Sequence, residues 1–306
     1  MTDPGRRKIR VILNPNAGQK AGVQTSQFGP DDILALMEQH GLGSEMVVTT
    51  CEEDATEATQ DAVARGYDAV VGVGGDGTVG CIARELIGSA TALGVVPGGS
   101  VMNIARMIGL PRELDAAFQT IAAGHTRKID VGEANGQLFF EAASVGLNAP
   151  VFEAGQRFDA GEYQSILQAI WVAIRYRPAR MAIRLDDGTI VTRALIVTVA
   201  NGAYTGMGFT VAPAADPGDG VFDISVFRRF SRTGLLLHFG RIAFGRKSYS
   251  PKVTTHRSRA VHISSVHPLP CRADSFDLGM TPVTFVCQHA ALNIITPDPD
   301  AVAANE

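Results

Sequence analysis

The sequence predicts an α/β chain with two domains, a doubly wound α/β domain followed by a mainly antiparallel β domain. Up to residue 126, short apolar segments alternate with helical patterns, which is typical of a parallel sheet covered by helices on both faces. Beyond residue 126 the pattern changes to strands joined by hairpin signals such as Asn135-Gly136. A chain of 306 residues is long enough to give each domain its own core.

The composition is that of an ordinary globular protein, with a net charge of −4. No apolar run approaches the ~20 residues of a membrane span, and the N-terminus lacks the apolar core of a signal peptide. The four cysteines and the histidines are scattered without metal-ligand spacing, so we expect free thiols and no zinc site. These observations predict a cytoplasmic protein.

The first half contains four expected strands, and each ends in small, polar or turn-forming residues. The carboxyl ends of parallel strands lie at one edge of the sheet, where open α/β folds bind their ligands. We therefore expect a polyphosphate pocket at this edge. The expected elements are strands at 8–13, 44–50, 69–73 and 93–96 and helices at 31–40, 52–66, 78–88 and 112–124, with a short helix between 97 and 111.

The second half reads mainly as strands, interrupted by two helical patterns. The first helical pattern, at 162–176, is apolar enough to line a slot for an acyl chain, and ordinary core packing explains it equally well. The expected strands are 128–131, 138–143, 181–185, 190–199, 221–227, 260–265, 282–287 and 292–295, and the second helix is 231–244.

The segment Asp68–Thr78 contains the strongest functional signal in the chain. Its apolar strand is followed by glycines at 72, 74, 75 and 77, and a helical pattern begins at Thr78. A glycine turn that leads into a helix exposes backbone N–H groups at the positive end of the helix dipole, and the absent Cβ atoms allow close approach. The segment therefore predicts a phosphate-binding site.

Asp76 stands in the middle of this site, where a carboxylate repels phosphate unless something intervenes. A Mg²⁺ ion, a substrate hydroxyl or hydrogen bonds from backbone N–H groups are three ways to neutralise it. A plain turn or N-cap role is the structural alternative. We favour a functional role, because four glycines crowd one strand end.

The same glycines fit the dinucleotide fingerprint Gly72-x-Gly74-x-x-Gly77. That fingerprint requires an acidic residue roughly 20 positions later, at the end of the next strand. The next strand carries no acid, and the nearest later one is Glu113. Hydride transfer is therefore disfavoured.

The chain carries six sequence blocks in a fixed order: Asn14-Pro-x-Ala-Gly18, Gly74-Gly-Asp-Gly-Thr78, Pro97-x-Gly-Ser100 with Ala105-Arg106, Ile129-Asp130, Ala214 to Asp223 and Thr281-Pro282. With these blocks the chain resembles the diacylglycerol kinase catalytic-domain family, which includes bacterial lipid kinases and sphingosine kinases. The resemblance runs nearly end to end. It implies an ATP-binding α/β domain at 8–126, a β-sandwich lipid domain at 127–289, and a chain end at about 290–300 that returns to the first domain.

The resemblance also implies binding residues. A Mg²⁺ loop matches Asp216-Pro-Gly-Asp-Gly220, with Asp216, Asp219 and the carbonyl of Val221 as ligands. Two carboxylates three positions apart in a tight turn suit a hard cation, although the same residues also form plain β-turns. The implied ATP contacts are Asn14, Pro15, Asn16, Ala17, Gly18, Thr49, Gly74, Gly75, Asp76, Gly77, Thr78, Val79, Gly80 and Ser100.

One departure from the family pattern concerns the proton acceptor. The family's Asp-Gly-Glu, whose Glu is the proposed general base, aligns with Asp274-Ser275-Phe276. Because Phe276 cannot accept a proton, we expect Asp76 or Asp277 to act as the catalytic carboxylate.

Three functions remain open at this point. The first is an ATP-dependent lipid kinase that phosphorylates the hydroxyl of diacylglycerol or a related lipid, with ATP and Mg²⁺ as cofactors. The second is a nucleotide- and lipid-binding protein that has lost catalysis. The third is a NAD kinase-like enzyme acting on a soluble dinucleotide, against which the apolar helix at 162–176 argues.

The expected partners follow from the lipid kinase interpretation. Between Arg228 and Arg259 the chain has nine Lys or Arg residues and no acid, so this segment predicts contact with the anionic inner face of a membrane. A solvated surface balanced by acids elsewhere is the alternative. We expect a lipid substrate, a homodimer and no nucleic-acid partner.

Overall fold

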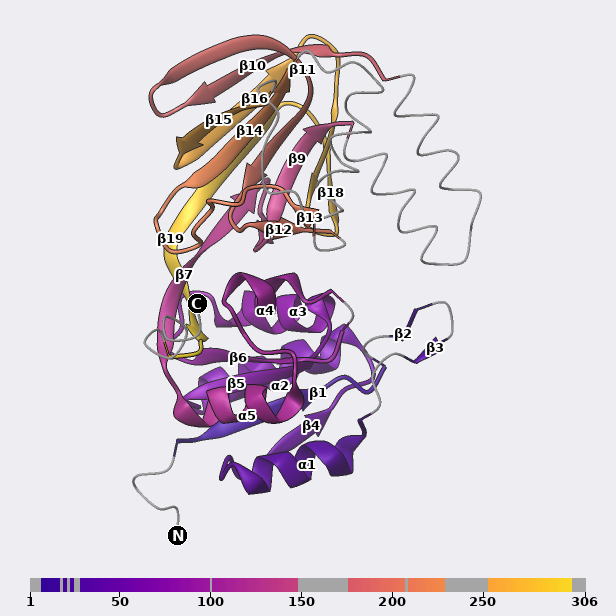
Figure 1. Ribbon diagram of the computed structural model, residues 1–306, viewed down its shortest axis with the longest axis vertical. Coiled ribbons are helices and arrows are strands. Elements are labelled where there is room, and N and C mark those ends of the chain that lie inside the picture. Colours follow the sequence, from indigo (N-terminus) through magenta and orange to yellow (C-terminus); the bar gives the residue numbers. More distant parts are fainter. Residues whose placement is uncertain are drawn as a thin grey trace. The chain divides into compact units, whose positions relative to one another are not determined.

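The computed structural model describes residues 7–16, 19–20, 23–24, 28–99, 101–147, 176–206, 209–228 and 253–298 (Figure 1). The chain forms two compact units, one made of Met1–Ile129 with Ala290–Glu306 and the other of Asp130–His289. The chain passes between the units within two strands, β7 (Thr126–Ala134) and β19 (Val283–Ile295).

The first unit is built on a parallel sheet. Its strands are β1 (Ile9–Leu13), β4 (Met46–Val48), β5 (Ala69–Gly74) and β6 (Ala92–Pro97), in the order β6-β5-β1-β4. The last residues of β19 extend this sheet, with Ile294 paired in parallel with Leu93. Every residue of β1, β5 and β6 is buried, because helices cover both faces of these strands.

The helices of the first unit pack in two groups, α1 with α5 and α2 with α3, and α4 contacts α3 (Figure 1). Acidic residues open α2, where they complement the helix dipole. The helices are α1 (Pro30–Gln39), α2 (Glu52–Ala64), α3 (Asp76–Leu86), α4 (Asn103–Met107) and α5 (Leu114–Ala123), and a small hairpin joins β2 (Gln19–Lys20) to β3 (Val23–Gln24).

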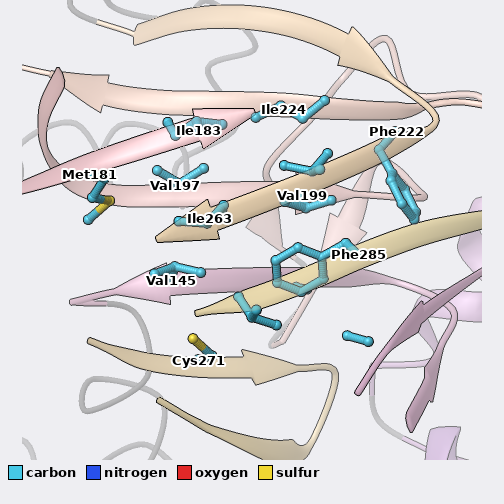
Figure 2. Packing of buried hydrophobic residues seen from close by; sticks show 14 of the residues in the cluster. Val145, Met181, Ile183, Val197, Val199, Phe222, Ile224, Ile263, Cys271 and Phe285 are labelled. Atoms are coloured by element: carbon cyan, nitrogen blue, oxygen red, sulfur yellow. The ribbon is translucent and has the colours of Figure 1, made fainter. Parts of the chain in front are cut away.

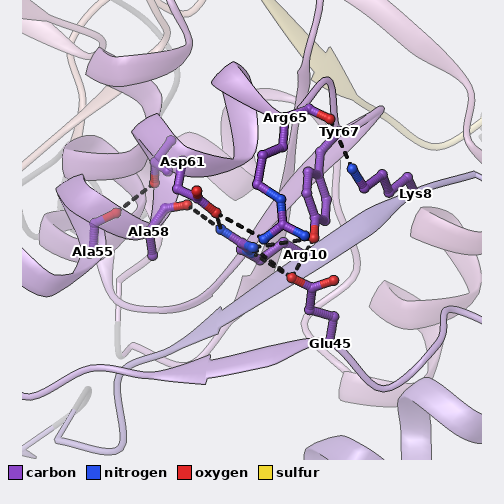
Figure 3. Close-up of polar contacts among 9 residues, drawn as sticks. Lys8, Arg10, Glu45, Ala55, Ala58, Asp61, Arg65 and Tyr67 are labelled. Atoms are coloured by element: carbon purple, nitrogen blue, oxygen red, sulfur yellow. Dashed lines mark hydrogen bonds and ion pairs between the residues drawn. The ribbon is translucent and has the colours of Figure 1, made fainter.

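A network of paired charges fills the amino-terminal edge of this sheet (Figure 3). Arg10 is only 5% exposed, and its guanidinium donates to Glu45 (2.6 Å), Asp61 (2.7 Å) and the carbonyl of Ala58 (2.9 Å). The hydroxyl of Tyr67 donates to the same Glu45 carboxylate. These contacts satisfy the buried guanidinium, which would otherwise be costly to bury.

The second unit is antiparallel and confirms the predicted fold class. Its main sheet has the order β18-β17-β9-β11-β10-β16-β19, and β14 with β15 branches from β11. Its strands, besides β7 and β19, are β8 (Gln137–Phe139), β9 (Ala142–Gly146), β10 (Ala179–Leu185), β11 (Gly188–Ala200), β12 (Tyr204–Thr205), β13 (Phe209–Thr210), β14 (Phe222–Arg228), β15 (Val253–Ser258), β16 (Ala260–Ser265), β17 (Pro270–Ala273) and β18 (Phe276–Met280).

A large apolar core lies in this unit, because alternate residues of its strands face inward (Figure 2). Phe139 stacks on Phe222 and meets Phe285 edge-on, with ring centroids 5.6 and 6.2 Å away. Val197, Val199 and the other buried β-branched residues pack around these rings.

Several elements differ from the sequence prediction. The strand expected at 138–143 is interrupted at Phe140 and Glu141, which separate β8 from β9. The strands expected at 282–287 and 292–295 form one strand, β19, in which Ala290 has a positive φ of 54°. The expected helices at 162–176 and 231–244 lie almost wholly outside the described residues.

Candidate nucleotide and metal-ion sites

The predicted phosphate loop lies at the carboxyl end of β5, where α3 begins. Gly75 is the N-cap of α3 and is extended, with φ −86° and ψ 179°, and Asp76 is the first helical residue. The N–H groups of a helix's first turn have no partner within the helix, so those of Asp76, Gly77 and Thr78 are directed to this edge. The local fold therefore provides the backbone donors that an anion site needs.

A second glycine turn, after β6, packs directly on the first. The N–H of Gly98 donates to the carbonyl of Gly74 (2.9 Å), and a Cβ on Gly99 would lie 2.9 Å from the Cα of Gly75. A Cβ on Gly77, by contrast, would meet nothing within 4 Å. Gly98 and Gly99 thus allow the two turns to touch, whereas the space beside Gly77 is open. Sequence analysis did not assign roles to Gly98 and Gly99, although the Gly-Gly pair was visible.

Asn14 connects the end of β1 to this loop. Its amide nitrogen donates to the hydroxyl of Thr78 (3.0 Å), and its amide oxygen accepts the N–H of Asn16 (3.0 Å). Its backbone N–H donates to the carbonyl of Val73 (3.0 Å). The structure therefore brings together Asn14, Asn16 and Thr78, which sequence reasoning placed in one site.

Other predicted contacts lie deeper or outside the described part of the chain. Thr49 is buried, and its hydroxyl donates to the carbonyl of Leu13 (3.2 Å). Val79 is buried in the core, and Gly80 faces the side chain of Arg84. Pro15 is half-buried beside Asn14, whereas Ala17, Gly18 and Ser100 fall outside the described residues.

The carboxylate of Asp76 is half-buried and lies at the start of α4. It accepts the N–H of Ile104 (3.4 Å), and the N–H groups of Asn103 and Met102 also favour its charge. Burial outweighs these donors and raises the pKa of Asp76 above its ordinary value. Sequence analysis considered three ways to neutralise the Asp76 carboxylate, and the structure shows one of them, hydrogen bonds from backbone N–H groups.

The predicted Mg²⁺ loop is a tight turn closed by its own carboxylates. Asp216 accepts the N–H of Gly218 (3.0 Å), and Asp219 accepts the N–H of Val221 (3.1 Å) and forms an ion pair with Arg257. Burial raises the pKa of the adjacent Asp223, an effect that Arg257 opposes and the Asp219 charge reinforces.

Asp130 holds this loop in place through hydrogen bonds. It is fully buried, and its carboxylate accepts the N–H of Gly220 (2.6 Å) and contacts Nδ1 of His289 (2.7 Å). Its backbone N–H donates to the carbonyl of Pro217, and Asn201 donates to its carbonyl (2.9 Å). Sequence analysis quoted Asp130 only as part of a matching block and gave it no role.

The residues of the loop fit Mg²⁺ in the kind of donor they offer. Two carboxylates and a backbone carbonyl are oxygen ligands, and Mg²⁺ usually keeps several waters besides such ligands. Arg257 already occupies one oxygen of Asp219, so a cation would share this carboxylate with Arg257. Among the described residues, no group of three or more His, Cys, Asp or Glu side chains is arranged to hold a metal ion.

Phe276 and Asp277 are the first two residues of β18, directly after the turn formed by Asp274 and Ser275. Asp274 has a positive φ of 46°, and its carboxylate accepts the N–H groups of Phe140 (2.8 Å), Glu141 (3.0 Å) and Ala142 (3.2 Å). Phe276 is half-buried, and the exposed Asp277 accepts the N–H of Gly279 (2.9 Å).

Glu141 is a buried acid beside this turn that sequence analysis did not consider. Its side chain accepts the N–H of Gly206 (3.3 Å), and its carbonyl accepts the N–H groups of Asn201 and Gly202. One acid in an apolar run gave no signal of this position.

Comparisons with known proteins agree with this architecture. Residues 8–134 match the model of the diacylglycerol kinase catalytic domain, and residues 141–296 match the YegS C-terminal NAD kinase beta sandwich-like domain. A diacylglycerol kinase from Mycobacterium tuberculosis (strain ATCC 25618 / H37Rv) is 30% identical over 95% of this chain and 95% of its own length. A diacylglycerol kinase from Bacillus subtilis (strain 168) is 26% identical over 95% of this chain and 97% of its own length.

Solved structures share the fold. One from Bacillus anthracis str. Sterne superposes with a TM-score of 0.78 at 23% identity and covers 97% of this chain and 99% of its own. A crystal structure of a diacylglycerol kinase from the same strain gives a TM-score of 0.73 at 22% identity over the same shares.

The fold defines a class of protein in which an α/β unit with a glycine-rich carboxyl edge is joined to an antiparallel β-sandwich. The chain belongs to the diacylglycerol kinase family. No helix in the described part of the chain has the length and apolar character that a membrane span requires.

Proposed function

We propose that the protein is a lipid kinase that transfers the γ-phosphoryl group of ATP to the hydroxyl of diacylglycerol or a related lipid. The observation that carries this proposal is the pair of touching glycine turns at the carboxyl edge of the first unit's sheet, beside the Asn14–Thr78 hydrogen bond. Its support from outside the structure is that end-to-end relatives are named diacylglycerol kinases.

Phosphoryl transfer asks a protein mainly to position the phosphates and to neutralise charge. The N–H groups of the first turn of α3 bind phosphate oxygens, and Asn14 orients the Thr78 hydroxyl toward the same edge. Asp216, Asp219 and the carbonyl of Val221 would hold Mg²⁺, which would supply charge neutralisation when bound. Asp76 or Asp277 accepts the proton of the lipid hydroxyl.

Loss of catalysis with retained binding is the second candidate. Phe276 favours it, since this position carries no proton acceptor, and Asp277 is directed back to the N–H of Gly279. Restoring a carboxylate separates the two candidates. A positioned general base contributes about 10²–10⁴-fold to a rate, so Phe276→Glu raises turnover by up to that factor if the native site lacks a base.

The primary experiment measures ADP release from ATP with a panel of lipid alcohols and, in parallel, with NAD. The proposal expects turnover with a lipid alcohol and none with NAD. Turnover with NAD alone would replace the proposal by a NAD kinase-like activity. Nucleotide binding without turnover on any acceptor would favour the second candidate, a binding protein that has lost catalysis. In that case Phe276→Glu tests whether activity can be restored. Phe276→Leu is the matched control, because it changes the packing without adding a carboxylate.

A further inference from the structure

One face of the second unit's sheet collects basic side chains, opposite the apolar core. In β10 and β11, Arg180 pairs across the strands with Arg193 and Ala182 pairs with Val191. In β10 and β16, Arg184 pairs with His262. Directly paired residues lie on the same face of a sheet, so these side chains share one surface. We call it the basic face and define it by Arg180, Arg184, Val191, Arg193, His262 and Val286.

Within the part of the chain that the structure describes, the three arginines of the basic face have no acidic partner. Arg180, Arg184 and Arg193 are exposed, and no described carboxylate forms an ion pair with them. No outward position among the paired residues of β10, β11, β16 and β19 is Asp or Glu. The nearest acids in sequence are Asp186 and Asp187 in the β10–β11 turn, and Asp186 accepts the N–H of Arg259 (2.7 Å). The face therefore has an uncompensated positive charge.

The Arg180–Arg193 pair is unfavourable for the fold itself. Like charges directly opposite each other on neighbouring strands destabilise a sheet. Strand propensity does not require arginine at either position, because the outward side chains of a half-exposed strand are solvated. Because this like-charge pair opposes folding and is exposed to solvent, it favours an interpretation in which the face binds an anionic partner.

We propose that the basic face docks on the surface of an anionic lipid bilayer. Guanidinium groups bind phosphate oxygens in a bidentate manner, and lipid headgroups present such oxygens in a plane. The exposed Val191 (57%) and Val286 (44%) add apolar contact between the charges. The choice of a bilayer rests on the proposed function, since a lipid alcohol with acyl chains is presented at a membrane surface.

Nucleic acid fits the face less well. Single strands are held by aromatic side chains on which bases stack, and the outward positions of these four strands contain no Phe, Tyr or Trp. The surface also lies on different residues from the basic segment Arg228–Arg259, of which residues 229–252 fall outside the described residues. The two surfaces can therefore be tested independently.

The test compares two triple variants of the full chain that remove the same charge. R180T/R184T/R193T changes the basic face, and R112T/R127T/K128T changes exposed basic residues of the other unit. Binding to phosphatidylcholine vesicles with about 30 mol% phosphatidylglycerol is measured by co-sedimentation without ATP, at low salt and at about 0.5 M salt. Each basic residue near an anionic surface contributes about fivefold, so the basic-face variant binds roughly a hundredfold more weakly while the control variant is unchanged.

Single Arg193→Thr is the sharper variant, because its two effects have opposite signs. The unfolding midpoint rises as the like-charge pair is removed, while vesicle affinity falls about fivefold. Equal loss in the control triple, or unchanged vesicle binding in the basic-face triple, would overturn the proposal. Loss of oligonucleotide binding with vesicle binding retained would also overturn it. The kinase function is tested separately, by turnover of lipid dispersed in neutral detergent micelles. The vesicle assay can therefore fail without affecting the kinase proposal, and the micelle assay can fail without affecting the docking proposal.

Discussion

The two edges of the first unit's sheet are built in opposite ways. At the amino-terminal edge, long charged side chains fill the surface: Arg10 contacts Glu45 and Asp61, and Lys8 lies 4.1 Å from the centre of the Tyr67 ring (Figure 3). At the carboxyl edge, glycines leave the backbone bare, and Gly99 touches Gly75 through main-chain atoms. One edge satisfies its own polar groups, whereas the other offers N–H groups to a ligand.

This difference separates stability from binding along the same strands. The donors of Arg10 are engaged within the protein, so the amino-terminal edge has little left to bind. At the carboxyl edge the space beside Gly77 is open, and the N–H groups of the first turn of α3 have no partner within the helix. Substitutions at the two edges should therefore affect different measurements.

The largest effect is expected for Gly75→Val. A Cβ at Gly75 meets only the Cα of Gly99 at 4.0 Å, and its φ of −86° suits any residue, so the fold should tolerate the change. The added side chain occupies the space that a phosphate needs. We expect ATP affinity to fall by at least about 100-fold with the unfolding midpoint nearly unchanged. Isothermal titration and thermal unfolding measure the two quantities, and an unaltered ATP affinity would place the phosphates elsewhere.

Asp76→Ala should separate turnover from binding at the same edge. The N–H groups of α3 survive the change, so ATP affinity should fall by less than about tenfold, whereas turnover should be abolished. Loss of the contacts to the start of α4 should cost about 1 kcal/mol of unfolding free energy. Asp76→Asn is the companion variant, since it removes the charge with little change in volume. Wild-type turnover in both variants would show that Asp76 acts only as a structural cap.

At the amino-terminal edge, Tyr67→Leu should reduce stability without affecting the enzyme. The substitution removes a hydrogen bond to Glu45 and the ring faced by Lys8, Arg10 and Arg65. We expect a loss of about 2 kcal/mol in unfolding free energy by denaturant titration. The ATP affinity of the folded variant should equal that of the wild type. A large change in affinity would mean that the two edges are coupled.

The smallest effect concerns the pH dependence of the same network. The hydroxyl of Tyr67, followed by the Arg10 guanidinium, lowers the pKa of Glu45 below its ordinary value. A depressed pKa stabilises the fold above the ordinary value, and this contribution is lost as pH falls through the folded value. Because Glu45 is half-exposed, we expect less than about 1 kcal/mol. Glu45→Gln should therefore show a shallower loss of stability between about pH 5 and 3 than the wild type.

Sequence reasoning worked where a local pattern decides the structure. The β-branched run before Gly74 predicts β5, and the glycines after it predict a helix start with exposed N–H groups. It failed for β15, which is rich in polar residues and is paired with β14 across a long connection. It also missed β17 and β18, two short strands that pair with each other across a two-residue turn. A polar strand has no periodic signal of its own, so its partner determines its structure.

The candidate site shows the same limit. The Asn14–Thr78 hydrogen bond joins residues 64 positions apart. The alternation of strands and helices placed both turns at one edge of the sheet, but it could not show that these two side chains meet. The contact of Asp76 with α4 and the support of Gly220 by Asp130 depend on distances that no spacing in the sequence encodes. Sequence supplied the chemistry at each position, and folding determined which groups meet.

The hydrogen bonds of the Asp274 carboxylate affect which substitutions this protein can accept during evolution. By accepting three consecutive N–H groups at residues 140–142, it holds the turn before β18 through main-chain contacts. The shape of that turn therefore depends on Asp274 rather than on the side chain at position 276. The same turn conformation can therefore carry either Phe276 or a carboxylate at this position. A substitution at residue 276 changes the chemistry there, while the backbone conformation held by Asp274 is retained.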